Sequence, residues 1–426
     1  VITPIFHRAG RDVLFYVGSR GHHADIGGST PGSMPPFSTT LDEEGVRFIN
    51  FKLIEGQGVD RPGRFREAEL RALLGGSRWP ARNPDQNVAD LKAQVAANEK
   101  GREDLLRLVD AFGLDVVRAY MRHVQDNAEE SVRRVIGVLK DGHFEYRLDN
   151  GATIRVAITV DRAQRSARID FTGTSAQLPN NFNAPSAICV AAVLYVFRTL
   201  VGDEIPLNAG CLKPLEIVIP PTSMLAPEYP SAVVAGNVET SMCITNALYG
   251  ALGVLASAQG TMNNFTFGDA RYQYYETISG GSGAGVVDIA AGAAGREGFD
   301  GTDVVQTHMT NSRLTDPEVL EFRDPVRLES YAIRSRSGGA GRWRGGNGGT
   351  RRVRFLEPMT ASVLSNNRAL APFGLAGGEA GQPGRNYVER ADGSVEMIGH
   401  IGSVPMHPGD VYVIETPGGG GYGANH

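Results

Sequence analysis

The stretch Phe144–Val160, FEYRLDNGATIRVAITV, contains a clear signal for the start of a sheet. Two runs suited to β-strands flank Asn150-Gly151, a pair that tolerates the positive φ angles of a tight type I′ turn. We therefore expect a β-hairpin with strands over 144–148 and 153–160. The elements expected after it are a strand, a buried helix and a further strand, over 168–172, 185–201 and 215–219. This order of elements predicts an α+β fold.

A helical layer is expected before this hairpin, from about residue 65 to 140, because apolar residues recur there at three- and four-residue spacing. Strands are expected upstream of it, over 1–6, 13–17 and 46–54. Beyond it, an apolar helix over 241–258 precedes short strands and Gly-rich loops, and an Ala- and Gly-rich run over 288–298 resembles a local insertion. We predict mixed sheets in two parts, an α+β part over 1–310 and a β-rich, Gly-rich part over 311–426.

Composition excludes several classes of function. The 426 residues carry a formal net charge of -5 and no long Lys/Arg run, which argues against a nucleic-acid surface. The longest uncharged apolar run, Ala187–Phe197, is too short to cross a bilayer, and no signal peptide opens the chain. The three unevenly spaced cysteines favour reduced thiols over disulfides. We therefore expect a cytoplasmic protein that binds neither nucleic acid nor membrane.

A metal-site candidate lies in the loop that follows the apolar run 13–17. His22, His23 and Asp25 stand within four positions, and neutral imidazole and carboxylate are ligands for zinc, manganese or iron. The alternative is a structural loop in which Asp25 closes an Asx-turn before Gly27. Because successive side chains of an extended segment point to opposite sides, only one of the two histidines is expected to face an ion. Further ligands must come from elsewhere.

Nucleotide-binding and nucleophile motifs are missing from the sequence. Gly418–Gly423 matches GxGxxG, but no helix follows it to hold a pyrophosphate. The sequence has no Gly-Lys pair, hence no Walker A loop, and no GxSxG motif. If the reaction uses ATP, another segment must bind it.

Three further polar groups are candidates for a site. Gly236–Ser241 opens a helix whose backbone N–H groups could hold an anion or a developing oxyanion, although N-capping by its hydroxyl residues is the alternative. The amides in Gln259–Asn264 could orient a polar substrate or satisfy a turn. His308 could act as a base or support a ligand, or it could be a structural residue beside a turn. The catalytic candidates are Glu239, Asn237, Asn264 and His308.

These segments together resemble the hydantoinase B/oxoprolinase family, which also includes subunits of acetone-type carboxylases. The segments that carry the resemblance occur in family order, at 20–28, 31–36, 170–175, 236–241, 259–264, 308–313 and 416–423. Arg82–Asn87 and Phe182–Pro185 are most similar to the C-terminal, hydantoinase B-like portion of bacterial ATP-dependent 5-oxoprolinases.

The resemblance implies the hydantoinase B-like half of an ATP-dependent cyclic amide hydrolase, most simply a 5-oxoprolinase. ATP and Mg would be bound by a hydantoinase A-like ATPase domain or subunit. A divalent metal (Zn, Mn or Fe) would assist attack on the activated carbonyl of a small cyclic amide, within a homo- or hetero-oligomer. The alternatives are an N-methylhydantoinase or lactamase, an acetone-type carboxylase subunit, and a non-catalytic scaffold.

The resemblance also implies metal ligands in part outside this sequence. His22 is the preferred ligand, with His23 and Asp25 as alternates, while a His and an Asp of the family pattern fall upstream of Val1. The chain starts without Met, in strand-like sequence, so we expect a preceding segment. The metal site within residues 1–426 is therefore expected to be incomplete.

Overall fold

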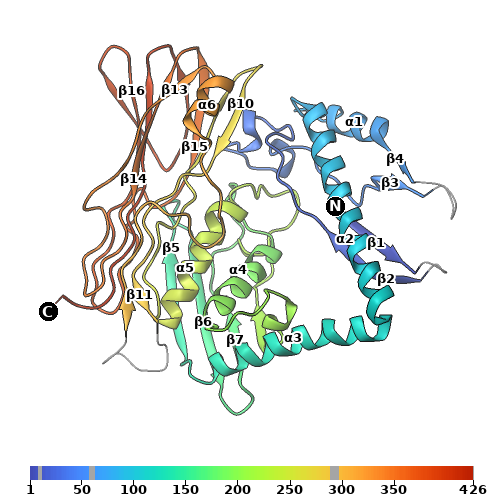
Figure 1. The fold of residues 1–426 in the computed structure, drawn as a ribbon. Helices are drawn as coiled ribbons and strands as arrows, with labels where there is room; N and C mark the ends of the chain where they lie inside the picture. Colours follow the sequence, from blue (N-terminus) through green and yellow to red (C-terminus); the bar gives the residue numbers. More distant parts are fainter. Residues whose placement is uncertain (8–11, 57–62, 288–296, 426) are drawn as a thin grey trace.

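The computed structural model describes residues 1–7, 12–56, 63–287 and 297–425. It confirms an α+β fold in which two helices at the centre of the molecule are flanked by sheets, and a helical arm extends to one side (Figure 1). The predicted insertion at 288–298 lies largely outside the described residues. Among the residues that are described, no helix is long and apolar enough to cross a membrane.

The predicted hairpin forms one side of a four-stranded sheet. Strand β5 (Gly142–Arg147) pairs with β6 (Thr153–Asp161) through a turn in which Gly151 has φ +85°. Strands β7 (Ser166–Asp170) and β8 (Leu215–Val218) complete the order β5-β6-β7-β8. Apolar residues on alternate positions of β6 are buried in the main core, against which α4 (Ser186–Thr199) and α5 (Ser241–Leu252) pack.

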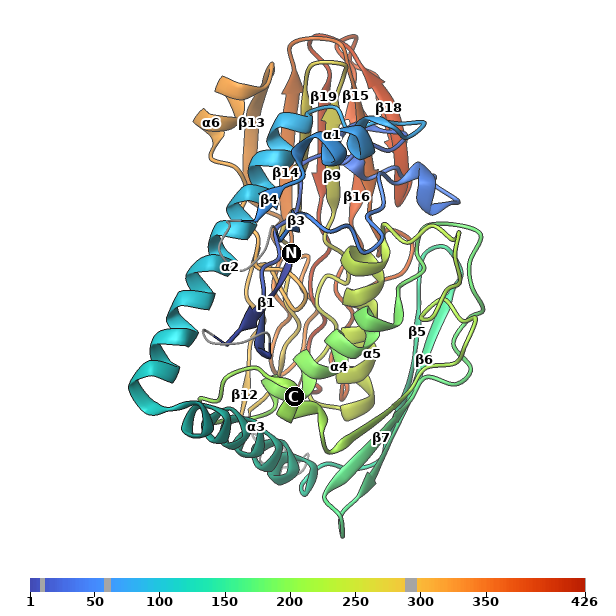
Figure 2. The ribbon, with the colours of Figure 1, turned by 90° about the vertical axis from the view of Figure 1, so that its right-hand side faces the viewer.

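The helical layer consists of α1 (Glu67–Gly75), α2 (Pro84–Phe112) and α3 (Leu114–Ile136). Asn83 caps α2 by accepting a hydrogen bond from the Gln86 N–H, and Gly113 takes φ +82° where α2 turns into α3 (Figure 2). The hairpin of β1 (Ile2–Phe6) and β2 (Val13–Gly18) packs on α2. The strand predicted over 46–54 is wrong, because only its last residue joins the short pair β3 (Ile54–Glu55) and β4 (Arg64–Phe65).

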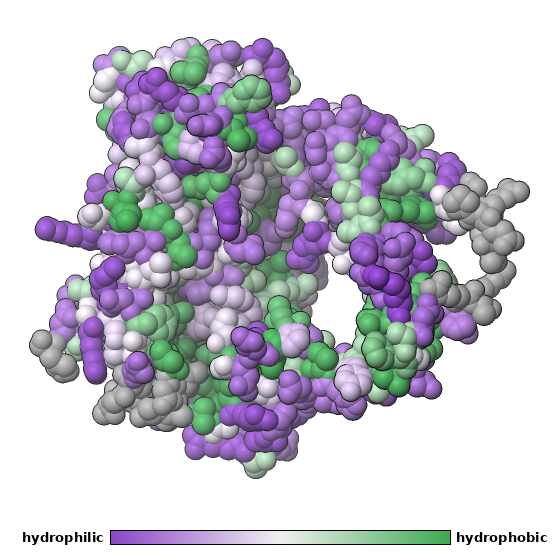
Figure 3. Space-filling view, viewed as in Figure 1, coloured by the Kyte–Doolittle hydropathy of each residue, from purple (hydrophilic) through white to green (hydrophobic). Residues whose placement is uncertain are grey.

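Apolar side chains are exposed at the elbow between α2 and α3. Phe112 and Tyr120 are 61% and 66% exposed, and Leu108 lies on the same face. Figure 3 shows apolar residues on this part of the arm, and an opening between the arm and the body of the molecule. Exposed apolar surface of this kind is typical of a contact site for another protein or domain.

Two antiparallel sheets form the β-rich part around a second core. One has the order β10-β9-β15-β18, with β9 (Asn264–Gly268), β10 (Gln273–Glu276), β15 (Met359–Leu364) and β18 (Ile401–Met406). The other has the order β13-β14-β19-β16-β17, with β13 (Val326–Ile333), β14 (Gly349–Phe355), β16 (Arg385–Glu389), β17 (Val395–Ile398) and β19 (Val411–Glu415). Shorter elements are β11 (Gly285–Val286), β12 (Gly298–Phe299) and α6 (Pro317–Arg323). Because β9 pairs with β15, the predicted division at 310/311 cuts through a sheet and does not separate two folding units.

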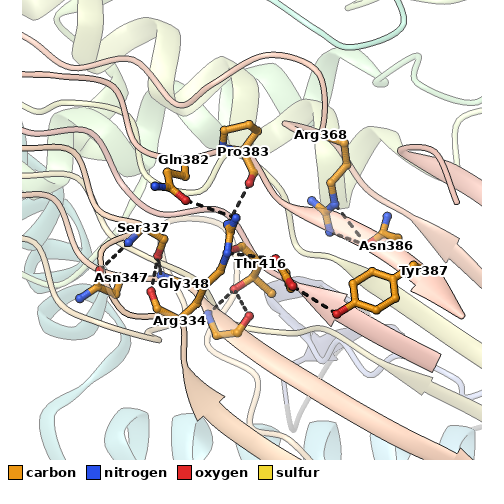
Figure 4. Close-up of polar contacts among 12 residues, drawn as sticks. Arg334, Ser337, Asn347, Gly348, Arg368, Gln382, Pro383, Asn386, Tyr387 and Thr416 are labelled. Carbon is orange, nitrogen blue, oxygen red and sulfur yellow. Dashed lines mark hydrogen bonds and ion pairs between the residues drawn. The ribbon is translucent and has the colours of Figure 1, made fainter. Parts of the chain in front are cut away.

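The Gly-rich segments expected as loops pack against one another through their backbones. The Gly339 N–H donates to the Gly419 carbonyl at 2.8 Å, and the Gly419 N–H donates to the Gly346 carbonyl at 2.9 Å. A Cβ on Gly419 would lie 1.9 Å from the Ser282 carbonyl oxygen, so this approach requires glycine. Figure 4 shows Arg334 bridging this layer by donating to the Pro383 carbonyl at 2.8 Å.

Candidate functional site

Five of the seven segments that carry the family resemblance, 20–28, 31–36, 236–241, 259–264 and 308–313, meet at a cavity of about 680 Å³. Its wall is built from the N-terminal loop, the segment before α5, Met262, strand β10 and the loop that follows His308. These parts are distant in the chain and are brought together because the N-terminal loop packs against the segment before α5 and against β9 and β10.

His22 and His23 both line this cavity. The His23 Nδ1 lies 2.9 Å from Asp90 Oδ2 on α2. A carboxylate partner of this kind favours a proton on Nδ1 and leaves Nε2 as the nitrogen with a free lone pair, as in many metal-bound histidines.

The prediction of Asp25 as a metal ligand is wrong. Its carboxylate is buried, and Oδ2 forms an ion pair with Arg82 Nη1 at 2.8 Å. Oδ1 accepts hydrogen bonds from the Gly27 and Arg82 backbone N–H groups, both at 3.0 Å. The hydrogen bond from Gly27 forms the Asx-turn that the sequence offered as the alternative to metal binding. Asp25 therefore fixes the loop that carries the histidines.

The imidazoles of His22 and His23 fit a divalent metal, but they do not form a complete set of ligands. In the described ranges, no three His, Cys, Asp or Glu side chains are grouped so that they could hold an ion. A metal here would need ligands beyond those ranges.

Glu239 and Asn264 are brought together, but behind the cavity wall. Glu239 is fully buried in the π-helical turn Gly236–Thr240. Its Oε1 accepts hydrogen bonds from the Met262 N–H at 2.9 Å and from Asn264 Nδ2 at 2.7 Å. Burial raises the pKa of Glu239 from 4.5 to about 7, and Oε2 has no hydrogen-bond partner among the described residues. Both the neutral and the charged form of Glu239 are therefore populated near physiological pH.

Tyr275 connects this buried pair to the cavity, whose wall it forms in part. Its hydroxyl donates to Asn264 Oδ1 at 2.8 Å. Since Asn264 Nδ2 donates to Glu239, the amide orientation is set from one side by the carboxylate and from the other by the phenol. Sequence analysis did not single out Tyr275, because an aromatic residue in a strand is commonly part of a core.

Asn237 is exposed and lines the cavity, as its candidate role requires. The start of the helix around Asn237 does not have the free backbone N–H groups that were predicted there. The Glu239 and Thr240 N–H groups both donate to the Ala235 carbonyl, at 2.8 and 3.1 Å, and so are not free for an anion. The alternative of N-capping is also wrong, because the Thr240 hydroxyl donates to the Phe182 carbonyl at 2.6 Å.

The amides of Gln259–Asn264 form an internal network. Asn263 Nδ2 donates to Gln259 Oε1 at 2.7 Å, and Arg368 Nη2 donates to Asn263 Oδ1 at 2.7 Å. Burial lowers the pKa of Arg368 to about 10. These contacts leave the network outside the cavity wall and favour the structural alternative.

His308 lies among aromatic rings and is not part of the cavity wall. Its Nδ1 is 3.4 Å from the Tyr195 hydroxyl, and burial lowers its pKa to about 4. The imidazole is therefore neutral at physiological pH. Its position does not support the predicted role as a base in the cavity.

Glu44 is a wall residue that sequence analysis missed. It follows Asp42 and Glu43 in an acidic turn, and nothing in the local sequence distinguishes a buried carboxylate from its exposed neighbours. Its partners, Val233 and Val234, lie 189 and 190 residues away. Only the folded chain reveals it.

Comparison with known proteins gives the family. A model described as hydantoinase B/oxoprolinase matches residues 1–425. The chain belongs to this family. It is 43% identical to the 5-oxoprolinase of Dictyostelium discoideum, over 99% of this chain and 32% of that protein. It is 41% identical to 5-oxoprolinase 1 of Arabidopsis thaliana, over 100% of this chain and 34% of that protein. The chain thus spans about a third of these relatives.

A solved structure shares the fold. The crystal structure of an ATP-dependent caprolactamase from Pseudomonas jessenii aligns with a TM-score of 0.80 at 24% identity. The alignment covers 99% of this chain and 74% of the other. The α+β arrangement described above is therefore shared with that protein.

Proposed function

We propose that this chain is the hydantoinase B-like half of an ATP-dependent cyclic amide hydrolase, with 5-oxoproline as the substrate. The observation that carries the proposal is the meeting of His22, His23 and Asn237 at one cavity. The 43% identity to a protein named 5-oxoprolinase supports the choice of substrate. ATP and Mg would be bound by a hydantoinase A-like domain or subunit, since this chain has no Walker A loop.

Two separate parts, one for ATP and one for ring opening, are expected because a lactam is a stable amide. A five-membered lactam carbonyl is a poor electrophile, so the ATPase half would transfer a phosphoryl group to the carbonyl oxygen. Water would then attack the ring carbon in the cavity. A divalent metal held by His22 and His23, with ligands from outside the described residues, would lower the pKa of a bound water.

The remaining residues have positioning roles in this proposal. The exposed amide of Asn237 would orient the polar ring. Glu239 would act through Asn264 and Tyr275, whose chain of hydrogen bonds fixes one wall of the cavity. The exposed apolar elbow between α2 and α3 supports contact with another part of the assembled enzyme. We expect that assembly to be a cytoplasmic homo- or hetero-oligomer.

Reconstitution with the ATPase half tests the proposal. We expect release of glutamate from 5-oxoproline only when ATP and the ATPase half are present. Hydrolysis without ATP would overturn the coupling, and activity on hydantoins or larger lactams alone would overturn the substrate. Replacing His22 with alanine should reduce activity by orders of magnitude, whereas a non-catalytic scaffold would keep nearly full activity.

A further inference from the structure

The cavity contains one carboxylate whose role is not explained by the family motifs. Among the described residues that form its wall, Glu44 is the only Asp or Glu, and its side chain is buried. It shares the cavity with His22 and His23, and it has no cationic partner in its hydrogen bonds. A buried carboxylate without a cation is costly, so its presence in a cavity calls for a reason.

The hydrogen bonds of Glu44 leave one oxygen available. Oε1 accepts from the Ser38 hydroxyl at 2.8 Å and from the Val233 and Val234 N–H groups at 3.0 Å. Within the described part of the chain, Oε2 accepts one hydrogen bond, from the Val233 N–H at 2.9 Å. Because a carboxylate oxygen offers two lone pairs, Oε2 keeps the capacity for one more proton or hydrogen bond. The side chain is thus held by three hydrogen bonds at Oε1 and by one at Oε2, which leaves Oε2 the less occupied oxygen.

Linking two segments is not a sufficient explanation for this carboxylate. The backbone already joins the N-terminal loop to the segment before α5, since the Leu41 N–H donates to the Pro230 carbonyl at 2.8 Å. The Ala232 N–H donates to the Thr39 carbonyl at 3.2 Å. These bonds hold the two segments together without the Glu44 side chain.

The charges around Glu44 suit a group that exchanges protons. Burial raises its pKa from 4.5 to about 7, against the lowering effect of its hydrogen bonds. Glu43, next to it in the chain, adds repulsion. The other titratable side chains in the cavity wall are those of His22, His23 and Tyr275. The segment 233–238 and the loop 309–312 contribute no charged side chain to it.

We propose that Glu44 is the proton acceptor for the water that attacks the activated ring carbon. This inference rests on the proposed function. As the C–O bond forms, the water O–H bond breaks, its proton moves to Oε2, and the π pair of the ring C=N bond moves to the nitrogen. The protonated Glu44 then returns the proton to that nitrogen as the C–N bond breaks, while the new hydroxyl loses its proton to solvent and becomes the C=O of an acyl phosphate. A second water then hydrolyses this acyl phosphate, which releases phosphate and the open-chain acid. Glu44 ends the step as a carboxylate, ready for another turnover.

The test uses the reconstituted enzyme with Glu44→Gln. Glutamine keeps an acceptor oxygen for Val233 and Val234 but cannot take a proton. We expect kcat to fall by about 100-fold or more, with KM nearly unchanged, and the acid limb of the pH profile of kcat to disappear. The matched control is Glu43→Gln, next in the chain and outside the cavity wall, which should keep the wild-type kcat.

Several results would overturn the role of Glu44. One is a folded Glu44→Gln enzyme with wild-type kcat and pH profile. If that variant does not fold, Ser38→Ala serves instead. Loss of the hydrogen bond from Ser38 should raise the pKa of Glu44 and so shift the acid limb of the pH profile of kcat to higher pH. An acid limb that does not shift refutes the proposal. A wild-type pair without ATP-dependent lactam hydrolysis refutes the proposed function and this inference together, whereas an active pair with an equally active variant refutes only this inference.

Discussion

Replacing Glu239 with glutamine should change how the stability of the protein depends on pH. Glu239 is fully buried and its pKa is raised from 4.5 to about 7, so the fold favours the protonated carboxyl. The stability that this preference contributes is present below about pH 4.5 and is lost as the pH rises through 7. A difference of 2.5 between these pKa values corresponds to about 3 kcal/mol over the full span.

The Glu239→Gln variant lacks this titration. Its amide has a fixed cost, since Oε2 of Glu239 has no hydrogen-bond partner and an NH2 group there would be unsatisfied. That cost does not change with pH. We therefore expect the unfolding free energy of the variant, relative to wild type, to rise by about 2 to 3 kcal/mol between about pH 5 and about pH 8.

Urea denaturation of both proteins at several pH values measures this difference. Glu43→Gln serves as a control, because it removes a carboxylate that is only half-buried. A difference between Glu239→Gln and wild type that stays flat with pH would refute the argument from burial.

Three further changes test other parts of the structure. Asp25→Asn should lower the unfolding free energy by about 3 kcal/mol, measured by denaturation, because the ion pair with Arg82 is lost. If Asp25 were instead a metal ligand, the variant would lose metal while its stability stayed unchanged. Gly419→Ala should destabilise the fold by about 3 kcal/mol or prevent folding, while Gly202→Ala, where a Cβ meets open space, should be nearly neutral in thermal melts. In Glu329→Gln, stability should be lost at neutral pH but match wild type near pH 2 in an acid titration, because two arginines lower the pKa of Glu329 to about 2.

The elements predicted correctly depend on local patterns. The hairpin around Asn150-Gly151 forms where expected because its strand pattern and turn residues lie in one short segment. The turn itself is not the type I′ turn predicted, since only Gly151 of the pair takes a positive φ. The helices of the layer from about 65 to 140 follow from periodic apolar positions within each helix. The strand expected over 46–54 failed because apolar residues in a loop can be buried without pairing, as Phe48 and Phe51 are partly buried beside α1 and α2.

The site depended on contacts between distant segments. The sequence placed His22 and His23 in a loop, but Asp25 was assigned to a metal because Arg82, its partner, is 57 residues away. Glu44 could not be distinguished from Glu43, since its burial depends on Val233 and Val234.

The sequence by itself determined the α+β class, the hairpin, the main helices and the family, because these depend on local patterns and on motifs that can be read in order. The tertiary structure alone decided which polar residues face the cavity. Burial and ion pairing arise only when segments far apart in the chain meet, so folding made Asp25 a support for the loop, left Glu239 behind the wall and placed Glu44 in it.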